Sequence, residues 1–337
     1  MAKVLIAPVH IGGQLLRYER CSKKIGIKAS SMALYDNKFG DFASINLSLN
    51  KQSNPCLSLM KRFYYFIYFL FNFEIFHFFF GETLLPNNWD LPILKLLKKK
   101  LLMNYWGSDI RLPPVIKKKS KYYVNSYKES ARKNIAKMKR VSKYIQNVAV
   151  QDYELYEYVL PYFKNIYILR STVEESEINF DIFNNMHKII ITHIPSQKEF
   201  KGSEIIEDVM IQLKKKYENL IYNTIVDIPI NEVKPRIIGS HLIIDQIRVG
   251  AHGIISVEAF SLGRPVICYI RDDLLKYYPK ELPIINANPE NLNKIIEKIL
   301  KKPEILKEYA KKSYNYYKKY HSPEVIGKQL MNIYKKL

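Results

Sequence analysis

Residues 245–270, DQIRVGAHGIISVEAFSLGRPVICYI, combine a glycine loop, a helix and a buried strand in an order typical of α/β proteins. The loop at 250–253 can pass close to a ligand, because glycine has no Cβ atom. We expect a helix from Ile254 to Leu262, with Gly263 suited to its C′ position. The apolar run 266–270 predicts a short buried strand. A helix N-terminus therefore lies beside a glycine loop.

The first turn of this predicted helix has backbone N–H groups that bind phosphate together with the helix dipole. Gly253 and Ile254 begin the helix, and Glu258 lies one turn further along the same face. A carboxylate there repels phosphate but suits a pair of sugar hydroxyls. The arrangement fits a nucleotide, with the diphosphate at the helix start and the ribose at the glutamate. An ordinary helix with a surface glutamate has the same spacing, and spacing alone leaves both interpretations open.

The N-terminal region predicts a βαβ unit. A strand at 4–9 precedes a turn at Gly12 and Gly13, a helix at 14–25 and a second strand at 27–34. This alternation is typical of a parallel, doubly wound sheet, so the fold class is α/β. The turn lacks the G-x-G-x-x-G fingerprint, which disfavours a Rossmann dehydrogenase. Gly12 and Gly13 fit a ligand-facing loop, and they fit a plain tight turn equally well.

Asp109 follows a predicted strand at 101–105, and α/β folds place ligands beyond the carboxyl ends of their strands. The carboxylate suits sugar hydroxyls. A loop that is capped by Asp109, with Arg111 paired to it, explains the same residues.

Lys201 and Gly202 follow another predicted strand, at 188–192, and stand at the start of a helix. A lysine in this place is a good ligand for a diphosphate, and a solvent-exposed lysine is the alternative. We expect Ser203 to cap the helix that follows.

Three segments resemble motifs of the family 4 GT-B glycosyltransferases. The donor signature is similar to residues 253–267, the K-G pair to 201–202, and the H-G-S-D-x-R segment to YWGSDIR at 105–111. The resemblance implies a GT-B architecture, in which two Rossmann-like doubly wound domains face each other across a cleft. It implies a retaining transfer of a hexosyl or N-acetylhexosaminyl group from a nucleotide-diphosphate donor to a lipid-linked or cell-envelope glycan. A UDP or GDP sugar would be the co-substrate, with no separate cofactor and no metal.

The resemblance also implies roles for single residues. Lys201 would contact the β-phosphate, Glu258 the ribose, and Asp109 the sugar or the acceptor. The catalytic candidates are Asp109 and Lys201, and the donor-binding candidates are Gly12, Gly13, His193, Ser196, Lys198, Lys201, Gly202, Gly253, Ile254 and Glu258.

The chain departs from the family pattern at three positions. Gly250 stands where the family has a glutamate, Trp106 where it has a histidine, and Pro195 where it often has an arginine. The first two departures remove polar contacts to the donor sugar, which implies an unusual donor. Polar residues near the third position that can substitute for the arginine are His193, Ser196 and Lys198.

The length of 337 residues is enough for two domains. We expect an N-terminal acceptor-side domain at 1–170, a linker at 171–187 and a nucleotide-sugar domain at 188–318. The resemblance implies that the last segment, 319–337, crosses back to the first domain. The three cysteines are far apart and show no metal spacing, which indicates free thiols in a reducing compartment. With no signal-peptide pattern at the start, we expect a cytoplasmic protein.

The formal net charge of +21 calls for an anionic partner. Residues 95–143 contain sixteen Lys or Arg and two acidic residues. Each cation near an anionic leaflet contributes ~1 kcal/mol, whereas interleaved tyrosines also fit RNA. Since the family commonly uses lipid-linked or membrane-bound acceptors, we expect peripheral attachment to the inner face of the cell membrane and no nucleic acid. The alternatives are a nucleotide-binding subunit without transfer activity and a basic RNA-binding protein on an α/β fold.

An aromatic stretch, FYYFIYFLFNFEIFHFFF, occupies residues 63–80 after a polar region at 35–60 that we expect to be irregular. Polar residues interrupt it, so it falls short of the ~20 apolar residues that span a bilayer. We expect a core helix to about Phe71 and a buried strand at 75–80. An interfacial helix is the alternative, because Lys61 and Arg62 precede residues that favour lipid headgroups.

Overall fold

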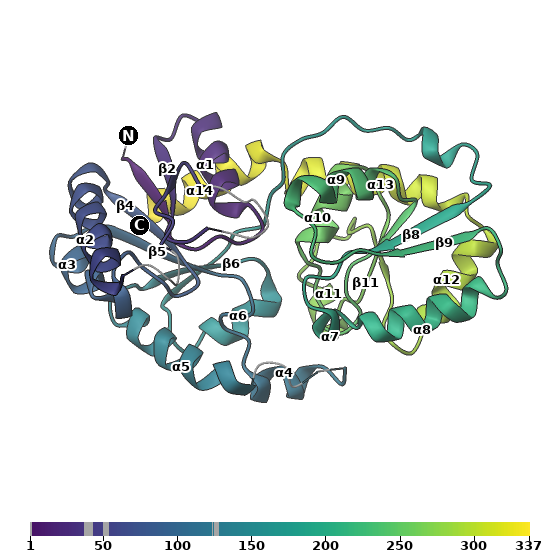
Figure 1. Cartoon of the computed structure of the whole chain (residues 1–337), viewed down its shortest axis with the longest axis horizontal. Helices are drawn as coiled ribbons and strands as arrows, with labels where there is room; N and C mark the ends of the chain where they lie inside the picture. Colours follow the sequence, from purple (N-terminus) through teal and green to yellow (C-terminus); the bar gives the residue numbers. More distant parts are fainter. Residues whose placement is uncertain (1, 37–42, 50–53, 123, 125–127) are drawn as a thin grey trace. The chain divides into compact units, whose positions relative to one another are not determined.

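The computed structural model describes residues 2–36, 43–49, 54–122, 124 and 128–337 (Figure 1). The chain forms two compact units, and each is discontinuous in sequence. Unit 1 comprises residues 1–115, 127–172 and 323–337, and unit 2 comprises 116–126 and 173–322.

Unit 1 contains a seven-stranded sheet in the order β3-β2-β1-β4-β5-β6-β7, and every strand pair is parallel. The strands β1 and β4 are adjacent, with Val4 opposite Ile75, and all their residues are buried. Parallel strands that are covered on both faces have such continuous apolar sequences. The strands are β1 Val4–Ala7, β2 Ala29–Ala33, β3 Ile45–Asn46, β4 Ile75–Phe79, β5 Lys100–Tyr105, β6 Asn147–Val150 and β7 Asn165–Ile168.

Helices cover both faces of this sheet. Figure 1 shows α1 and α14 on one side of it and α5 and α6 on the other. The last helix, α14, packs against α1, and Tyr334 Oη lies 2.9 Å from His77 Nδ1 of β4. The helices that begin in unit 1 are α1 Gln14–Lys24, α2 Pro55–Asn72, α3 Asp90–Leu96, α4 Pro113–Lys119, α5 Lys128–Ser142, α6 Tyr153–Val159 and α14 Pro323–Lys336, with a 3-10 turn η1 at Pro86–Asn88.

The helix α2 begins earlier than the sequence analysis expected. Residues 55–60 are helical, so the prediction of irregular structure up to residue 60 was wrong there. The physical reason is a local start signal, because Asn54 Oδ1 accepts the Cys56 N–H at 2.9 Å and Pro55 occupies the first turn. Within the part of the chain that the structure describes, none of the helices could serve as a membrane span.

Unit 2 contains a five-stranded parallel sheet in the order β12-β11-β10-β8-β9. Its core lies where α8, α12 and α13 pack on the central strands. The strands are β8 Ile189–His193, β9 Leu220–Thr224, β10 Leu242–Ile244, β11 Val266–Cys268 and β12 Ile284–Asn286. The helices are α7 Lys198–Lys201, α8 Ser203–Lys214, α9 Ile230–Ile238, α10 Ile254–Ser261, α11 Asp272–Leu275, α12 Leu292–Lys301 and α13 Ile305–Tyr320, with a 3-10 turn η2 at Asp181–Phe183.

Candidate functional site

The strand order of unit 2 reverses direction between β8 and β10. After β8 the chain adds β9 on one side of it, and then returns to place β10 on the other side. In open α/β sheets such a switch point, at the carboxyl ends of the strands, is the usual place for a ligand. His193 ends β8, and Asp245 directly follows β10. These two residues therefore mark the candidate site of unit 2.

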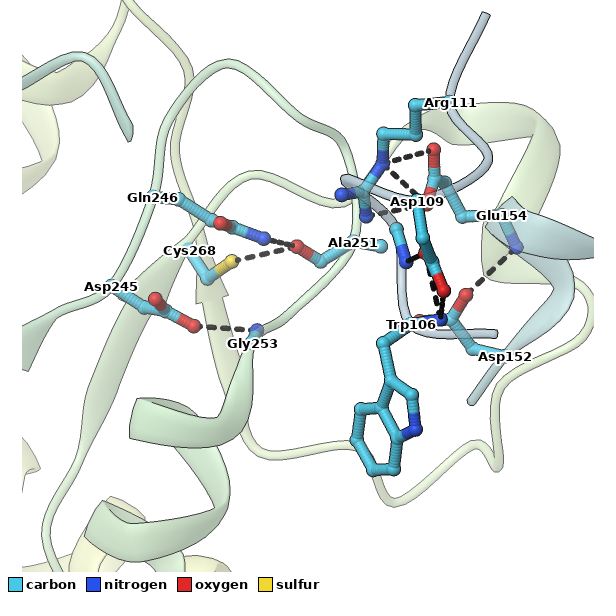
Figure 2. A network of polar contacts seen from close by, with 11 residues as sticks. Trp106, Asp109, Arg111, Asp152, Glu154, Asp245, Gln246, Ala251, Gly253 and Cys268 are labelled. Carbon is cyan, nitrogen blue, oxygen red and sulfur yellow. Dashed lines mark hydrogen bonds and ion pairs between the residues drawn. The ribbon is translucent and has the colours of Figure 1, made fainter. Parts of the chain in front are cut away.

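Asp245 binds two other segments of unit 2, the end of α7 and the start of α10. Its Oδ1 accepts a hydrogen bond from Lys201 Nζ at 2.5 Å, and its Oδ2 accepts the Gly253 N–H at 2.6 Å and the Ser256 hydroxyl at 2.7 Å. Figure 2 shows the bond to Gly253 at the beginning of α10. Burial by itself would raise the pKa of Asp245, but Lys201 and the two other donors outweigh burial and lower that pKa. The carboxylate is thus ionised and holds the lysine beside the start of α10.

Lys201 ends the short helix α7, and its side chain is buried. Gly202 has a φ of +81°, which allows the chain to turn directly into α8. A Cβ atom on Gly202 would lie 2.7 Å from Ile247 Cγ1, so the close packing of this turn also requires glycine. The ammonium of Lys201 consequently points to Asp245 rather than into solvent.

His193 is fully buried and both its ring nitrogens have partners inside the protein. Nδ1 lies 2.8 Å from the carbonyl oxygen of Ile244, and Nε2 lies 2.8 Å from Ser203 Oγ. Burial lowers the pKa of His193 to about 4, so the ring is neutral at physiological pH. The expectation that Ser203 caps α8 was wrong: the N-cap is Gly202, and Ser203 is the first helical residue, with its hydroxyl engaged by the histidine.

The other predicted donor-binding residues of unit 2 belong to the segment after β8 and to the start of α10. Ser196 and Lys198 are exposed on the segment after β8. Gly253 is the N-cap of α10, Ile254 is its first residue, and Glu258 is half-buried one turn later. The structure therefore brings Lys201, Gly202 and Gly253 together at the switch point.

The structure explains why position 250 is a glycine, which the sequence alone did not. Its φ is +90°, and a Cβ atom there would lie 2.2 Å from Cγ of Arg271. The Gly250 carbonyl accepts the Arg271 N–H at 2.9 Å, and the guanidinium forms two 2.9 Å hydrogen bonds to Asp273. The Arg271 side chain thus fills the space that a glutamate at position 250 would need.

In unit 1, the strand order reverses between β1 and β4, and the loop after β1 contains Gly12 and Gly13. Their φ angles are +48° and +75°. The Gly12 carbonyl accepts a hydrogen bond from Gln14 Nε2 at 3.1 Å, and Gly13 is the N-cap of α1. The glycines therefore form a tight turn at the switch point of their own sheet.

Asp109 lies in the loop after β5 and is buried. Its Oδ1 accepts the N–H groups of Trp106 and Gly107 at 3.1 and 2.7 Å. Figure 2 shows Asp109 beside Trp106. Burial raises the pKa of this carboxyl to about 6, although the backbone donors oppose the increase. Arg111 forms a bidentate ion pair with Glu154, with Nη2 and Oε2 2.7 Å apart. Asp109 therefore braces its loop, and a role in binding sugar remains a prediction.

Asp245 and Ser256 are the site residues that sequence reasoning missed. The available signal was an aspartate immediately after the apolar run 242–244. Nothing local indicated that its partner would be Lys201, which is 44 residues away. Among the described residues, no group of three or more His, Cys, Asp or Glu side chains could hold a metal ion.

No protein-family model and no curated protein matches the chain. Solved structures do match over its full length. Sucrose-phosphate synthase from Thermosynechococcus elongatus has 13% identity, a TM-score of 0.68, and coverage of 100% of this chain and 99% of that one. Anabaena HepE in complex with UDP-glucose has 11% identity, a TM-score of 0.64 and full coverage of both chains. A putative UDP-N-acetylglucosamine 2-epimerase from Listeria monocytogenes has 12% identity, a TM-score of 0.57, and coverage of 99% and 96%.

At these identities the likeness concerns the fold. The chain consists of two doubly wound α/β units, each with a parallel sheet and a reversal of strand order. Solved structures such as sucrose-phosphate synthase match it along its whole length. The chain therefore has the fold of the GT-B glycosyltransferases.

Proposed function

We propose that this protein is a glycosyltransferase that binds a nucleotide-diphosphate sugar at the N-terminus of α10. The observation that carries the proposal is the convergence of a buried lysine, a helix N-terminus and a glycine loop at the switch point of unit 2. Backbone N–H groups and a fixed cation are the donors that a diphosphate requires. The fold is also that of a HepE structure that contains UDP-glucose.

The residues of this site have different roles in the proposed mechanism. The amide of Ile254 and its neighbours in the first turn of α10 bind the diphosphate, and Lys201 offsets the charge that develops on it as the sugar departs. Asp245 occupies the Gly253 N–H and holds Lys201 beside the start of α10, from where the ammonium would reach the diphosphate while it stays paired with the carboxylate. Glu258 accepts hydrogen bonds from the ribose hydroxyls. Lys201 is thus the proposed catalytic residue of unit 2.

The remaining site roles rest on the sequence resemblance. Asp109 would contact the sugar or the acceptor, and Gly12 and Gly13 would face the reactants. Ser196 and Lys198 are exposed, and they would meet the donor phosphates. We propose a retaining reaction with a UDP or GDP sugar, and a lipid-linked or cell-envelope glycan as the acceptor.

The proposed cellular setting is the cytoplasmic face of a membrane. A lipid-linked acceptor presents its glycan at that surface, and the inner leaflet is anionic. The net charge of +21, with sixteen cations between residues 95 and 143, complements such a surface.

A nucleotide-binding subunit without transfer activity is a second candidate. It is favoured by Arg271, which fills the place of the family glutamate, and by Asp109, whose carboxylate braces its own loop. Both features remove polar groups that the family resemblance assigns to the donor sugar.

Thermal denaturation with UDP, GDP, ADP and CMP tests the donor site. A nucleotide at a hundredfold excess over its Kd stabilises the native state by ~2.7 kcal/mol. We expect UDP or GDP to raise the melting temperature, and Glu258→Gln to remove most of this increase. Glu232→Gln, an exposed acidic residue on α9, is the matched control and should respond like the wild type. If none of the four nucleotides stabilises the wild type, the donor-site proposal is wrong.

The responding nucleotide then selects labelled sugar donors for a turnover assay with extracted membrane lipids as acceptors. Release of the nucleotide with label in the lipid fraction supports transfer. Stabilisation without any turnover supports the subunit without activity. An epimerised nucleotide sugar without transfer would replace the proposed reaction by the activity named for the Listeria structure.

A further inference from the structure

The helix α2 exposes a continuous stripe of large apolar side chains. Its inner face buries Phe66, Phe69 and Leu70. Its outer face exposes residues at intervals of three or four, the spacing of one side of a helix. Phe71 and Tyr64 are 82% and 69% exposed. The exposed residues of α2 are Leu57, Leu59, Met60, Phe63, Tyr64, Ile67, Tyr68 and Phe71.

The helix α3 lies beside α2 and extends this surface. Arg62 of α2 donates hydrogen bonds to the carbonyls of Thr83 and Leu84, shortly before α3 begins. Lys99, just after α3, donates to the carbonyl of Phe73 at the end of α2, at 2.8 Å. These bonds attach the chain segments on either side of α3 to α2. The exposed residues that α3 and its flanks add are Trp89, Ile93, Leu96 and Leu97, and we call the exposed side chains of both helices the α2–α3 face.

Exposure of so many large apolar side chains in one place indicates a binding surface, because a scattered few need no explanation but a contiguous patch does. Leu96 is 81% exposed, so its side chain lies almost entirely in water. A patch of this kind is expected to be covered by a partner.

The charges around the α2–α3 face are mostly positive, and Glu74, just after the end of α2, is the exposed acidic residue beside them. Residues 55–73 include Lys61 and Arg62 but no Asp or Glu. Lys95, Lys98 and Lys100 are exposed within and directly after α3, whereas Asp90 is buried. Tyrosine and tryptophan among the apolar side chains are typical of the lipid interface, where one end of the ring is wet.

We propose that the α2–α3 face inserts into the surface of an anionic phospholipid bilayer, with α2 lying in the plane of the interface. Amphipathic helices with lysine beside Trp, Phe and Leu bind in this way. A second copy of the chain would bring two sets of lysines together, and like charges across an interface are unfavourable. The inference deepens the proposed membrane setting, and it is independent of the donor site in unit 2.

Vesicle co-sedimentation tests this surface directly. The probe is vesicles of phosphatidylcholine containing about one third phosphatidylglycerol, compared with pure phosphatidylcholine. We expect binding to the anionic vesicles, and a loss of about tenfold in the partition coefficient for each of Phe71→Ser and Leu96→Ser. Ile211→Ser, an exposed apolar residue on α8 of unit 2, is the matched control and should bind like the wild type. Unchanged melting curves show that the variants remain folded.

Light scattering after size-exclusion chromatography measures the oligomeric state, and it tests whether a second copy of the chain covers the α2–α3 face instead. A wild-type dimer that Phe71→Ser and Leu96→Ser convert to monomers would assign the face to a second copy and overturn the proposal. Vesicle binding that the two substitutions leave unchanged, or no vesicle binding at all, would also overturn it. The increase in melting temperature with UDP or GDP is measured on the same variants. If the variants keep this increase, a failure of the membrane proposal is distinguished from a failure of the donor site.

Discussion

Replacing Lys201 by methionine is the perturbation whose effect follows most directly from the structure. The substitution keeps the length of the side chain but leaves the carboxylate of Asp245 buried without its cation. Removing one partner of a buried ion pair costs ~3–5 kcal/mol. Since Gly253 and Ser256 still donate to Asp245, we expect a loss near the lower limit, about 3 kcal/mol. For a unit of this size the melting temperature should fall by about 6–12 °C.

The pH dependence of this loss provides a sharper assay. The folded pKa of Asp245 is lowered, so the wild-type pair stabilises the fold above the unfolded pKa and loses this contribution as the pH falls through the folded pKa. Without Lys201, burial dominates and the carboxyl protonates more readily. Protonation removes the buried charge, so the difference in melting temperature between wild type and Lys201→Met should shrink from pH 7 to about pH 4.

Two further variants complete the experiment. Lys201→Met combined with Asp245→Asn removes both charges and should recover more than half of the lost stability, because asparagine still accepts from Gly253 and Ser256. Lys198→Met changes an exposed lysine at the start of the same short helix and should stay within ~0.5 kcal/mol of the wild type. A Lys201→Met protein as stable as the wild type, or a loss that does not vary with pH, would refute the reasoning about the buried pair.

Two other predictions follow from the same region. Gly250→Ala should lower the free energy of unfolding by ~1–3 kcal/mol, and by more than Gly26→Ala does. Both glycines have a positive φ, but only at Gly250 would a Cβ atom meet a side chain. Equal melting temperatures for the two variants would contradict this prediction. The His193 imidazole should show no titration between about pH 5 and 8 by NMR, since its pKa is about 4. Because the pKa of His193 is lower in the folded than in the unfolded protein, the stability should fall as the pH drops between these two values. His193→Gln should weaken this pH dependence. A His193 that titrates near pH 6.5 would disprove the lowered pKa.

The fold class could be predicted from the sequence. The alternation of strand, helix and strand in residues 4–34 indicated a parallel, doubly wound sheet, and buried strands such as VLIA at 4–7 and IFHFF at 75–79 agree with it. The glycine loop before α10 and the K-G pair before α8 were also visible, because their backbone requirements are local. These local signals predicted a ligand site at these segments, and in the structure Lys201 and Gly253 both bind Asp245 at the switch point of unit 2.

The partners of those residues were decided by the tertiary structure. Lys201 meets Asp245 because β8 and β10, which are distant in sequence, are neighbours in the sheet. Arg271 is placed against Gly250 in the same way, by the chain that follows β11. A residue's type gives its chemistry, but its neighbours depend on strand order.

Helix α2 shows the same division between local and tertiary information. Its aromatic composition was evident in the sequence, yet an apolar helix with few charges fits a core and an interface equally well. Which of its sides is covered depends on the sheet and on α3, and these leave Phe71 and Tyr64 in solvent. The sequence therefore determined that α2 is apolar, and only the packing of unit 1 decided which of its side chains remain uncovered, because burial is a property of contacts between distant segments.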